Sequence, residues 1–254
     1  MSFFAFQRVA IGYAKHRPYY HPVVMNSVRQ QLNLKGKFGN ALDVGCGTGL
    51  STIALKELAD NVTGIDGSEE MIAVANVYRD EQIIYHHASA ERLPFDEGSF
   101  DLITVCGAIN WIDRALFFPE TKRVLNEQGW VIIYDNFITE YMRENVAYTQ
   151  WYQEQFLSRY PKPPRNETPL TPSECEDYGF RFNQEEYTNE LTWSREEYIE
   201  YMLTQSNVIV AVDMGNETLS EARKWMHTTL APIVPDREKG TFLFGGYIWY
   251  MQLV

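Results

Sequence analysis

Glycine residues that follow a short apolar run are the strongest chemical signal in this sequence. Residues 41–50 read Ala-Leu-Asp-Val-Gly-Cys-Gly-Thr-Gly-Leu. Gly45, Gly47 and Gly49 let the backbone turn tightly and let a ligand approach the main chain without obstruction by Cβ atoms. The helix expected to follow directs free N–H groups and a positive dipole end at that ligand. The segment therefore predicts a site for a nucleotide-like molecule at the carboxyl end of a strand.

The residues around the glycines discriminate between nucleotide-like ligands. The dinucleotide pattern Gly-x-Gly-x-x-Gly requires glycine at position 50, where this chain has Leu50. Asp43 precedes the first glycine by two residues, and its carboxylate disfavours a pyrophosphate but suits a ligand with ammonium and sulfonium groups. No Gly-Lys-Ser/Thr sequence follows, which excludes a Walker phosphate loop. A nicotinamide dinucleotide is therefore disfavoured.

A carboxylate at the end of the next predicted strand supplies the second signal. The strand Asn61-Val-Thr-Gly-Ile-Asp66 places Asp66 where a bound ribose presents two hydroxyls, and the carboxylate can accept a hydrogen bond from each. The alternative is that Asp66 only caps the helix expected to begin near Glu69. Beside the glycine turn, the ribose role is favoured.

Alternating strands and helices must position these groups. Strands are expected at 41–44, 61–65, 83–86, 101–105 and 130–134, and helices at 51–59, 69–79 and about 115–126. This alternation predicts an α/β, doubly wound, Rossmann-like fold with a mostly parallel sheet. After an aromatic stretch at 137–160 and a proline-rich stretch at 161–172, we expect a strand at 181–188, helices at 194–204 and 217–230, and a closing strand at 241–253.

Composition excludes several classes of function. The chain has 254 residues, with 22 Lys and Arg against 34 Asp and Glu, and a formal net charge of −12. Such a charge repels phosphate backbones, so nucleic acid is not expected as a partner. Cys46, Cys106 and Cys175 make neither a disulfide framework nor a paired metal signature, so no metal is expected. Without a leader or a long apolar run, the expectation is a cytoplasmic protein with no membrane span.

Four ordered stretches carry a family resemblance. They are Leu42-Asp-Val-Gly-Cys-Gly-Thr-Gly49, Val62-Thr-Gly-Ile-Asp-Gly-Ser-Glu-Glu-Met71, Ala88-Ser-Ala-Glu-Arg-Leu-Pro-Phe95 with Ser99-Phe-Asp101, and Val124-Leu-Asn-Glu-Gln-Gly-Trp-Val131. The chain resembles the class I S-adenosylmethionine-dependent methyltransferases, in the small-molecule branch that includes trans-aconitate and quinone-ring methyltransferases. The resemblance implies a seven-stranded sheet with an antiparallel closing strand, a helical and aromatic cap, S-adenosyl-L-methionine as cofactor and a small-molecule substrate.

The resemblance also implies a domain order and a set of cofactor-binding residues. The order is lid helices over 1–35, a cofactor-binding core over 36–136, a substrate cap with remaining core elements over 137–235, and the closing strand within 236–254. Around the methionine part it implies Asp43, Gly45, Cys46, Gly47 and Gly49. Asp66 and Gly67 would lie at the ribose, Met71, Ser89 and Ala90 at the adenine, and Cys106 near the transferable methyl. The lid would bring Tyr13 and Arg17 to the cofactor carboxylate, unless Arg17 instead pairs with a surface acid.

The acceptor side is less defined. The loop after the fourth strand would place Asn110 and Trp111 near the methyl group, although Trp111 could also be core, and relatives often carry His or Gln where this chain has Asn110. The cap adds Tyr152, Tyr201 and Ser206 as substrate candidates. In-line methyl transfer mainly needs alignment and exclusion of water, so the catalytic residue stays unassigned, with His16, Tyr13 and Tyr20 as candidates.

The acceptor would be a carboxylate, a hydroxyl or an activated carbon, and the protein a monomer or homodimer. Two alternatives share the fold: a protein that binds the cofactor without turnover, and an enzyme that modifies the cofactor itself.

Overall fold

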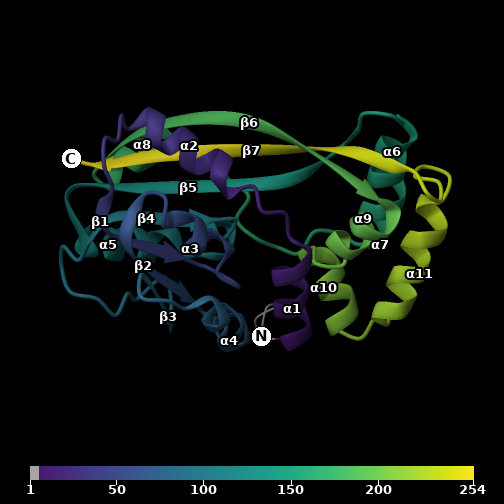
Figure 1. The fold of residues 1–254 in the computed structure, drawn as a ribbon, viewed down its shortest axis with the longest axis horizontal. Coiled ribbons are helices and arrows are strands. Elements are labelled where there is room, and N and C mark those ends of the chain that lie inside the picture. Colours follow the sequence, from purple (N-terminus) through teal and green to yellow (C-terminus); the bar gives the residue numbers. More distant parts are fainter. Residues whose placement is uncertain (1–5) are drawn as a thin grey trace. The chain divides into compact units, whose positions relative to one another are not determined.

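The computed structural model describes residues 6–254, and its first half alternates strands with helices (Figure 1). Helices α1 (Gln7–His16) and α2 (His21–Gln31) precede the sheet. The chain then forms β1 (Phe38–Val44), α3 (Leu50–Leu55), β2 (Ala59–Asp66), α4 (Glu69–Ala75), β3 (Ile83–His87), β4 (Phe100–Cys106), α5 (Arg114–Val124) and β5 (Leu125–Met142). Each of the five strands predicted for this half is present.

The second half adds short helices between two long strands. In order they are α6 (Ala147–Gln150), a π-helix (Trp151–Phe156), α7 (Leu157–Arg159), α8 (Pro172–Asp177), β6 (Phe180–Ser194), α9 (Arg195–Met202), α10 (Ser206–Asp213), α11 (Leu219–Leu230) and β7 (Lys239–Leu253). The proline-rich stretch forms neither helix nor strand until Pro172 opens α8, where its missing N–H costs nothing.

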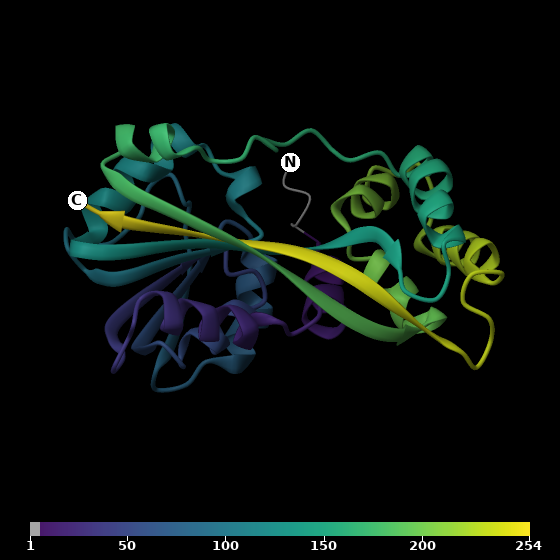
Figure 2. The same cartoon turned by 90° about the horizontal axis from the view of Figure 1, so that it is seen from above.

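The seven strands form one sheet in the order β3-β2-β1-β4-β5-β7-β6. The pairs of β1 with β2 and β4, of β2 with β3 and of β4 with β5 are parallel. β7 runs antiparallel to β5. Arg143 N–H donates to the Thr241 carbonyl and the Thr139 hydroxyl donates to the Leu243 carbonyl, so residue numbers fall along one strand as they rise along the other. Figure 2 shows β7 running opposite to its neighbours, with α2 and α3 on one face of the sheet and α5 and α8 on the other. The predicted fold class is confirmed.

The chain divides into two compact units. We call one the sheet unit (Tyr19–Asp135, Arg165–Glu186 and Tyr247–Val254) and the other the helical unit (Asn136–Pro164 and Tyr187–Gly246, with the described residues up to Pro18). β5, β6 and β7 each contribute residues to both units. The predicted lid, residues 1–35, is divided between the two units, and its first five residues lie outside the described part of the chain.

Each unit has its own apolar core. In the sheet unit, strand residues such as Leu42 and Ile103 pack with Phe117 and Phe118 of α5. The core of the helical unit is aromatic, and the rings of Tyr198 and Phe242 stack with centroids 4.0 Å apart. Aromatic pairs of this kind stabilise a core beyond the area they bury. Many of the aromatic residues of the second half therefore form the core of the helical unit.

The differences from the predicted elements have local causes. α3 ends at Leu55 rather than near Ala59, because Ala59 already pairs in β2. β5 extends to Met142, but polar and apolar residues do not alternate over 135–142, so the sequence lacks the strand pattern there. The sequence also gave no indication of α10 as a separate helix. In contrast, the expected capping box at Ser194 is present: its side chain accepts from Glu197 N–H, and the Glu197 carboxylate accepts from Ser194 N–H.

Within residues 6–254 none of the helices is both long and apolar enough to cross a membrane. The same residues contain no cluster of three or more His, Cys, Asp or Glu side chains arranged to hold a metal ion.

Candidate functional site

The glycine turn after β1 combines two tightly packed positions with one open position. Gly45, Gly47 and Gly49 have φ angles of 69°, 53° and 89°, in the left-handed region that favours glycine. A Cβ on Gly45 would lie 2.5 Å from Cβ of Ala108, and one on Gly49 would lie 2.5 Å from the Tyr85 hydroxyl oxygen. A Cβ on Gly47 would meet nothing within 4 Å. Packing therefore fixes the two outer glycines, and the backbone at Gly47 is open to a ligand.

Asp66 connects the end of β2 to this open position. Its Oδ2 accepts a hydrogen bond from Gly47 N–H at 2.9 Å, and its Oδ1 accepts from Ser68 N–H at 2.8 Å. Each carboxylate oxygen retains a further lone pair with which it could accept from a ribose hydroxyl. The alternative role as helix cap is wrong, because the side chain that caps α4 is Ser68, whose Oγ accepts from Met71 N–H at 3.2 Å.

Asp43 lies beneath the turn and is fully buried. Its Oδ2 accepts from the hydroxyls of Ser51 and Thr52 at 2.6 and 2.7 Å, and its Oδ1 accepts from Thr104 at 2.9 Å. Burial raises the pKa of Asp43 to about 6, although these hydrogen bonds oppose the shift. The side chain exposes no surface to a ligand in this conformation, so any effect of Asp43 on a cofactor would act through its charge and through the turn it supports.

The other residues expected at the cofactor differ in exposure. Gly67 is open, because a Cβ there would meet nothing within 4 Å. Met71 and Cys46 are only 2% and 4% exposed. The Ser89 hydroxyl is exposed and donates to the Glu91 carboxylate, and Ala90 packs at the edge of the sheet-unit core. The structure thus brings these residues together within the sheet unit, and their individual contacts with a cofactor stay predictions.

The imidazole of His87 is an additional polar group at this edge of the sheet. His87 pairs with Asp66 in the β2–β3 register, and its Nε2 lies 3.1 Å from the carbonyl oxygen of Gly67. Burial raises the pKa of Asp66, and the nearby His87 partly offsets that rise. The sequence showed only a histidine at a strand end, and the register was needed to place it beside Asp66.

This strand–turn–helix matches a known family. Residues 42–133 match the family described as a methyltransferase domain. The chain carries a class I methyltransferase domain. The cofactor of this domain class is S-adenosylmethionine, as the sequence predicted.

Relatives and solved structures agree with the domain assignment. The chain is 28% identical to a Dictyostelium discoideum protein over 63% of this chain and 60% of that relative. The name of that protein gives it as a methyltransferase whose activity is inferred. It is 39% identical to a Staphylococcus epidermidis demethylmenaquinone methyltransferase over 44% of this chain and 48% of the relative. The chain therefore spans about half to three fifths of the length of these curated relatives. In fold it is similar to a solved structure from Anaeromyxobacter dehalogenans, assigned there by inference as a type II methyltransferase, with a TM-score of 0.69 and 21% identity over 92% of this chain and 97% of that one.

Within the methyltransferase domain, the end of β4 leads into the predicted acceptor-side loop. Asn110 and Trp111 belong to a short 3-10 helix (Ile109–Trp111) and are partly exposed. The Asn110 carbonyl oxygen accepts from Asn166 N–H at 3.1 Å, and the Arg165 guanidinium lies 5.8 Å from the Trp111 ring centroid. Trp111 is therefore partly exposed rather than fully buried, and its role as a wall of the site stays a prediction.

Sequence reasoning missed two side chains close to the end of β4, namely His21 and Tyr134. Tyr20, a proton-acceptor candidate, lies with its hydroxyl 3.1 Å from Sγ of Cys106. Next to it, the buried His21 lies against the hydroxyl of Tyr134. Burial raises the pKa of Tyr20 well above its usual value, so its hydroxyl stays protonated and is a poor proton acceptor. No spacing in the sequence connects His21 with Tyr134.

The remaining candidates lie in the helical unit. Arg17 donates to the Tyr13 hydroxyl at 2.9 Å and to the Thr204 carbonyl at 2.7 Å, and its guanidinium lies 4.3 Å from the Tyr13 ring centroid. Tyr201, another ring beside Arg17, is buried, whereas Tyr152 is half-buried and stacks on Phe156.

The two other helical-unit candidates lie at helix ends. Ser206 begins α10. Nε2 of His16 lies 3.5 Å from the Glu200 carboxylate, and burial lowers the pKa of His16. The roles of all these residues toward cofactor or substrate stay predictions.

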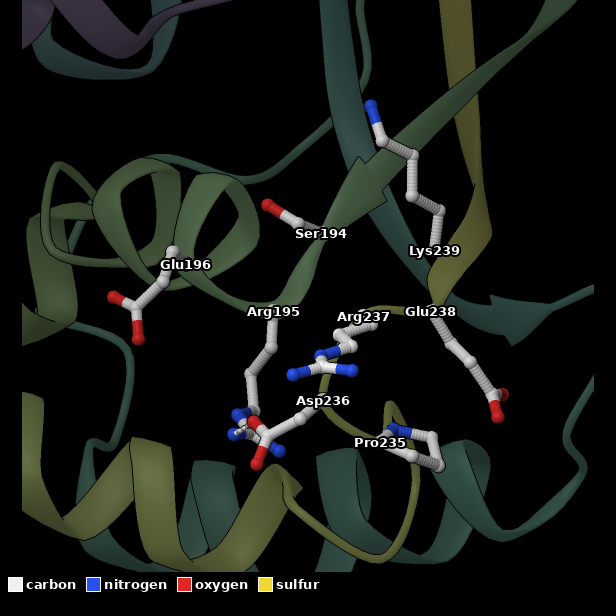
Figure 3. A pocket seen from close by; sticks show the side chains of 8 residues that line it. All are labelled: Ser194, Arg195, Glu196, Pro235, Asp236, Arg237, Glu238 and Lys239. Carbon is white, nitrogen blue, oxygen red and sulfur yellow. Dashed lines mark hydrogen bonds and ion pairs between the residues drawn. The ribbon is translucent and has the colours of Figure 1, made fainter.

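A small pocket in the helical unit lies between the start of α9 and the turn before β7 (Figure 3). Its walls carry three basic and three acidic side chains. Arg195 is buried and donates to Asp236, and Lys239 lies 3.6 Å from the Glu197 carboxylate. Because these charges neutralise each other locally, the pocket offers no excess charge to a ligand, and we assign it no function.

Proposed function

We propose that the protein transfers the methyl group of S-adenosylmethionine to a small-molecule acceptor. The observation that supports this most directly is the hydrogen bond from Gly47 to Asp66, which places an open backbone turn beside a carboxylate with free lone pairs. Residues 43–50 contain no basic side chain. A site made of backbone amides and a carboxylate suits a nucleoside with a cationic sulfur better than a polyphosphate.

The residues of the turn would have separate roles. Asp66 would accept hydrogen bonds from both ribose hydroxyls, and the backbone at Gly47 would contact the methionine part. Met71 would pack at the adenine, with Ser89 and Ala90 at its edge. When bound, S-adenosylmethionine supplies a methyl group that its sulfonium activates toward nucleophiles. The contribution of the protein is then to align the acceptor in line with that methyl and to exclude water.

The acceptor is proposed only as a class: a carboxylate, a hydroxyl or an activated carbon. A relative that is a demethylmenaquinone methyltransferase makes a quinone-type ring a reasonable first compound to test. Its similarity covers 44% of this chain, which leaves more than half of the chain, including residues that would select an acceptor, without a match to that enzyme. An acceptor that is already ionised needs no base, whereas a neutral hydroxyl benefits from one.

Calorimetric titration tests the cofactor assignment first. S-adenosylhomocysteine should bind with a dissociation constant in the micromolar range, about −8 kcal/mol, and NAD should give no heat. Incubation with methyl-labelled S-adenosylmethionine and a pool of small metabolites should then yield a labelled product. Binding without any labelled product would favour a cofactor-binding protein without turnover. Absence of S-adenosylhomocysteine binding would contradict the proposal.

A further inference from the structure

In the sheet unit, four side chains form a polar cluster where the carboxyl end of β4 lies beside the middle of β5. We call Tyr20, His21, Cys106 and Tyr134 the His21 cluster. Nδ1 of His21 lies 3.1 Å from the Tyr134 hydroxyl oxygen and 3.9 Å from Sγ of Cys106. The Tyr20 hydroxyl lies 3.1 Å from the same Sγ, and the Tyr20 ring stacks on the imidazole with centroids 4.5 Å apart. His21 therefore contacts each of the other three members.

The His21 cluster is connected to residues 106–108, which follow β4 and pack on the glycine turn after β1. Cys106 pairs with Tyr134 in the sheet register, and Gly107 N–H donates to the Tyr134 carbonyl at 2.9 Å. The chain bends at Gly107, whose φ is 61°. Ala108 then packs so closely on Gly45 that a Cβ on that glycine would lie 2.5 Å from Cβ of Ala108. A displacement of residues 106–108 would therefore be transmitted to the glycine turn.

We infer that His21 is a positioning residue for the cofactor site, which it supports through Tyr134 and Cys106 by fixing residues 106–108 against Gly45. This inference rests on the proposed function, because it assumes that the glycine turn binds the cofactor. His21 is 4% exposed, so it acts without touching a ligand. It belongs to α2, and it thereby ties the start of that helix to the same turn.

The protonation state of His21 fits this role. Burial lowers the pKa of His21 to about 4, so the imidazole is neutral at physiological pH. A neutral imidazole can form the hydrogen bond to Tyr134 without placing a charge beneath the site. A group with so low a pKa is a weak base, and removal of a proton from the acceptor is not its task.

Affinity for S-adenosylhomocysteine tests the inference without knowledge of the acceptor. His21→Phe keeps an aromatic ring beside Tyr20 but removes the hydrogen bond to Tyr134, whereas His21→Asn can place an amide close to the position of Nδ1. Tyr134→Phe removes the other partner of the same bond. As a matched control, Tyr148→Phe removes an equally buried tyrosine hydroxyl from the helical unit, where it bonds to Tyr198.

In calorimetric titrations at neutral pH, His21→Phe and Tyr134→Phe should each weaken binding about fivefold. His21→Asn should restore affinity to within about twofold of the parent, the double variant should be no weaker than either single variant, and Tyr148→Phe should bind like the parent. Thermal unfolding establishes that each variant is folded at the titration temperature.

Parent-like affinity of both His21→Phe and Tyr134→Phe would overturn the inference. A second result would also overturn it: His21→Phe and His21→Asn both lose affinity for S-adenosylhomocysteine, while Tyr134→Phe binds it like the parent. A parent protein that does not bind S-adenosylhomocysteine would instead count against the proposed function, so the two failures are distinguishable. If His21→Phe does not fold, Tyr134→Phe and His21→Asn decide the question, because both keep the ring volume or polarity of the native cluster.

Discussion

The backbone amide of Gly47 and the carboxylate of Asp66, nineteen positions apart in the chain, are joined by a hydrogen bond of 2.9 Å. This bond links the turn after β1 to the end of β2, two neighbouring parallel strands. A parallel sheet brings the carboxyl ends of adjacent strands to one edge, which explains why sites of α/β proteins form there. In this protein the same carboxylate both shapes the open turn and remains able to accept further hydrogen bonds.

Asp66→Ala should weaken binding of S-adenosylhomocysteine by about 1.5–3 kcal/mol, the range for hydrogen bonds to a charged group. The reason is that the variant loses the acceptor for the ribose hydroxyls and also releases the Gly47 amide. Isothermal titration calorimetry measures the change. Asp80→Ala, which removes an exposed carboxylate that pairs with Lys56, serves as the control. Unaltered affinity in Asp66→Ala would remove the ribose assignment.

Alanine substitutions at Gly49 and Gly47 should separate the cost of a steric clash from the cost of an unfavourable backbone conformation. Gly49→Ala meets the Tyr85 hydroxyl and has an unfavourable φ, so we expect a loss of about 2–4 kcal/mol in unfolding free energy. Gly47→Ala has open space and should lose only the backbone term, about 1–2 kcal/mol. Chemical denaturation measures both. Tyr85→Phe removes the nearest clashing atom and should recover part of the Gly49→Ala loss; equal losses at the two glycines would contradict this interpretation.

Removal of the N-cap of α9 should lower the stability of the protein without changing its affinity for the cofactor product. Ser194→Ala deletes the side chain that accepts from Glu197 N–H at the start of α9, and this should lower the unfolding free energy by about 1 kcal/mol. Because Ser194 belongs to the helical unit, affinity for S-adenosylhomocysteine should stay at the parent value. Denaturation and calorimetry on the same preparation test both statements. A large loss of affinity in Ser194→Ala would show that the N-terminus of α9 contributes to the cofactor site.

The parts of this molecule that the sequence could predict are those set by local pattern. The strands up to Tyr134, the Gly45–Gly49 turn and the role of Ser194 as a cap all follow from residue type and spacing. Asp43 was recognised as unusual, but its burial beneath three hydroxyls depends on Thr104 of a strand about sixty residues away. Contacts of that kind depend on sheet order and register, which spacing within one segment does not determine.

The same limit applies to the His21 cluster. Its members come from the start of α2, the end of β4 and the middle of β5. Each residue alone resembles an ordinary core side chain, and only the pairing of Cys106 with Tyr134 brings them together. The length of β5 was underestimated because polar and apolar residues come in pairs over 135–142 instead of alternating, so that Asn136 is buried while Phe137 is exposed.

His21 should make the folded state sensitive to acid. Its pKa is about 4 in the folded protein and 6.5 when unfolded, so the unfolded chain takes up a proton first as the pH falls. The stability that the neutral imidazole contributes is fully present above pH 6.5 and is lost as the pH falls toward 4. The difference corresponds to about 3 kcal/mol. Relative to His21→Asn, whose side chain does not titrate, the parent should therefore lose about 3 kcal/mol of unfolding free energy between pH 7 and pH 4, and a constant difference would contradict the assignment.

Asp43 should have the opposite pH dependence. Its pKa is about 6 in the folded protein against 3.8 in the unfolded chain, so the folded state holds its proton more tightly. The stability gained from that proton is fully present below pH 3.8 and is lost as the pH rises through 6. Asp43→Asn keeps a side chain of the same size that stays uncharged at every pH. Relative to the parent, it should therefore become progressively more favourable as the pH rises, by about 2 kcal/mol between pH 4 and pH 6. Because the His21 and Asp43 contributions oppose each other over this range, the parent alone would show little net slope from the two groups. Denaturant titrations of the parent, Asp43→Asn and His21→Asn across pH 4–7 separate them, and parallel curves for the parent and Asp43→Asn would mean that burial does not raise the Asp43 pKa.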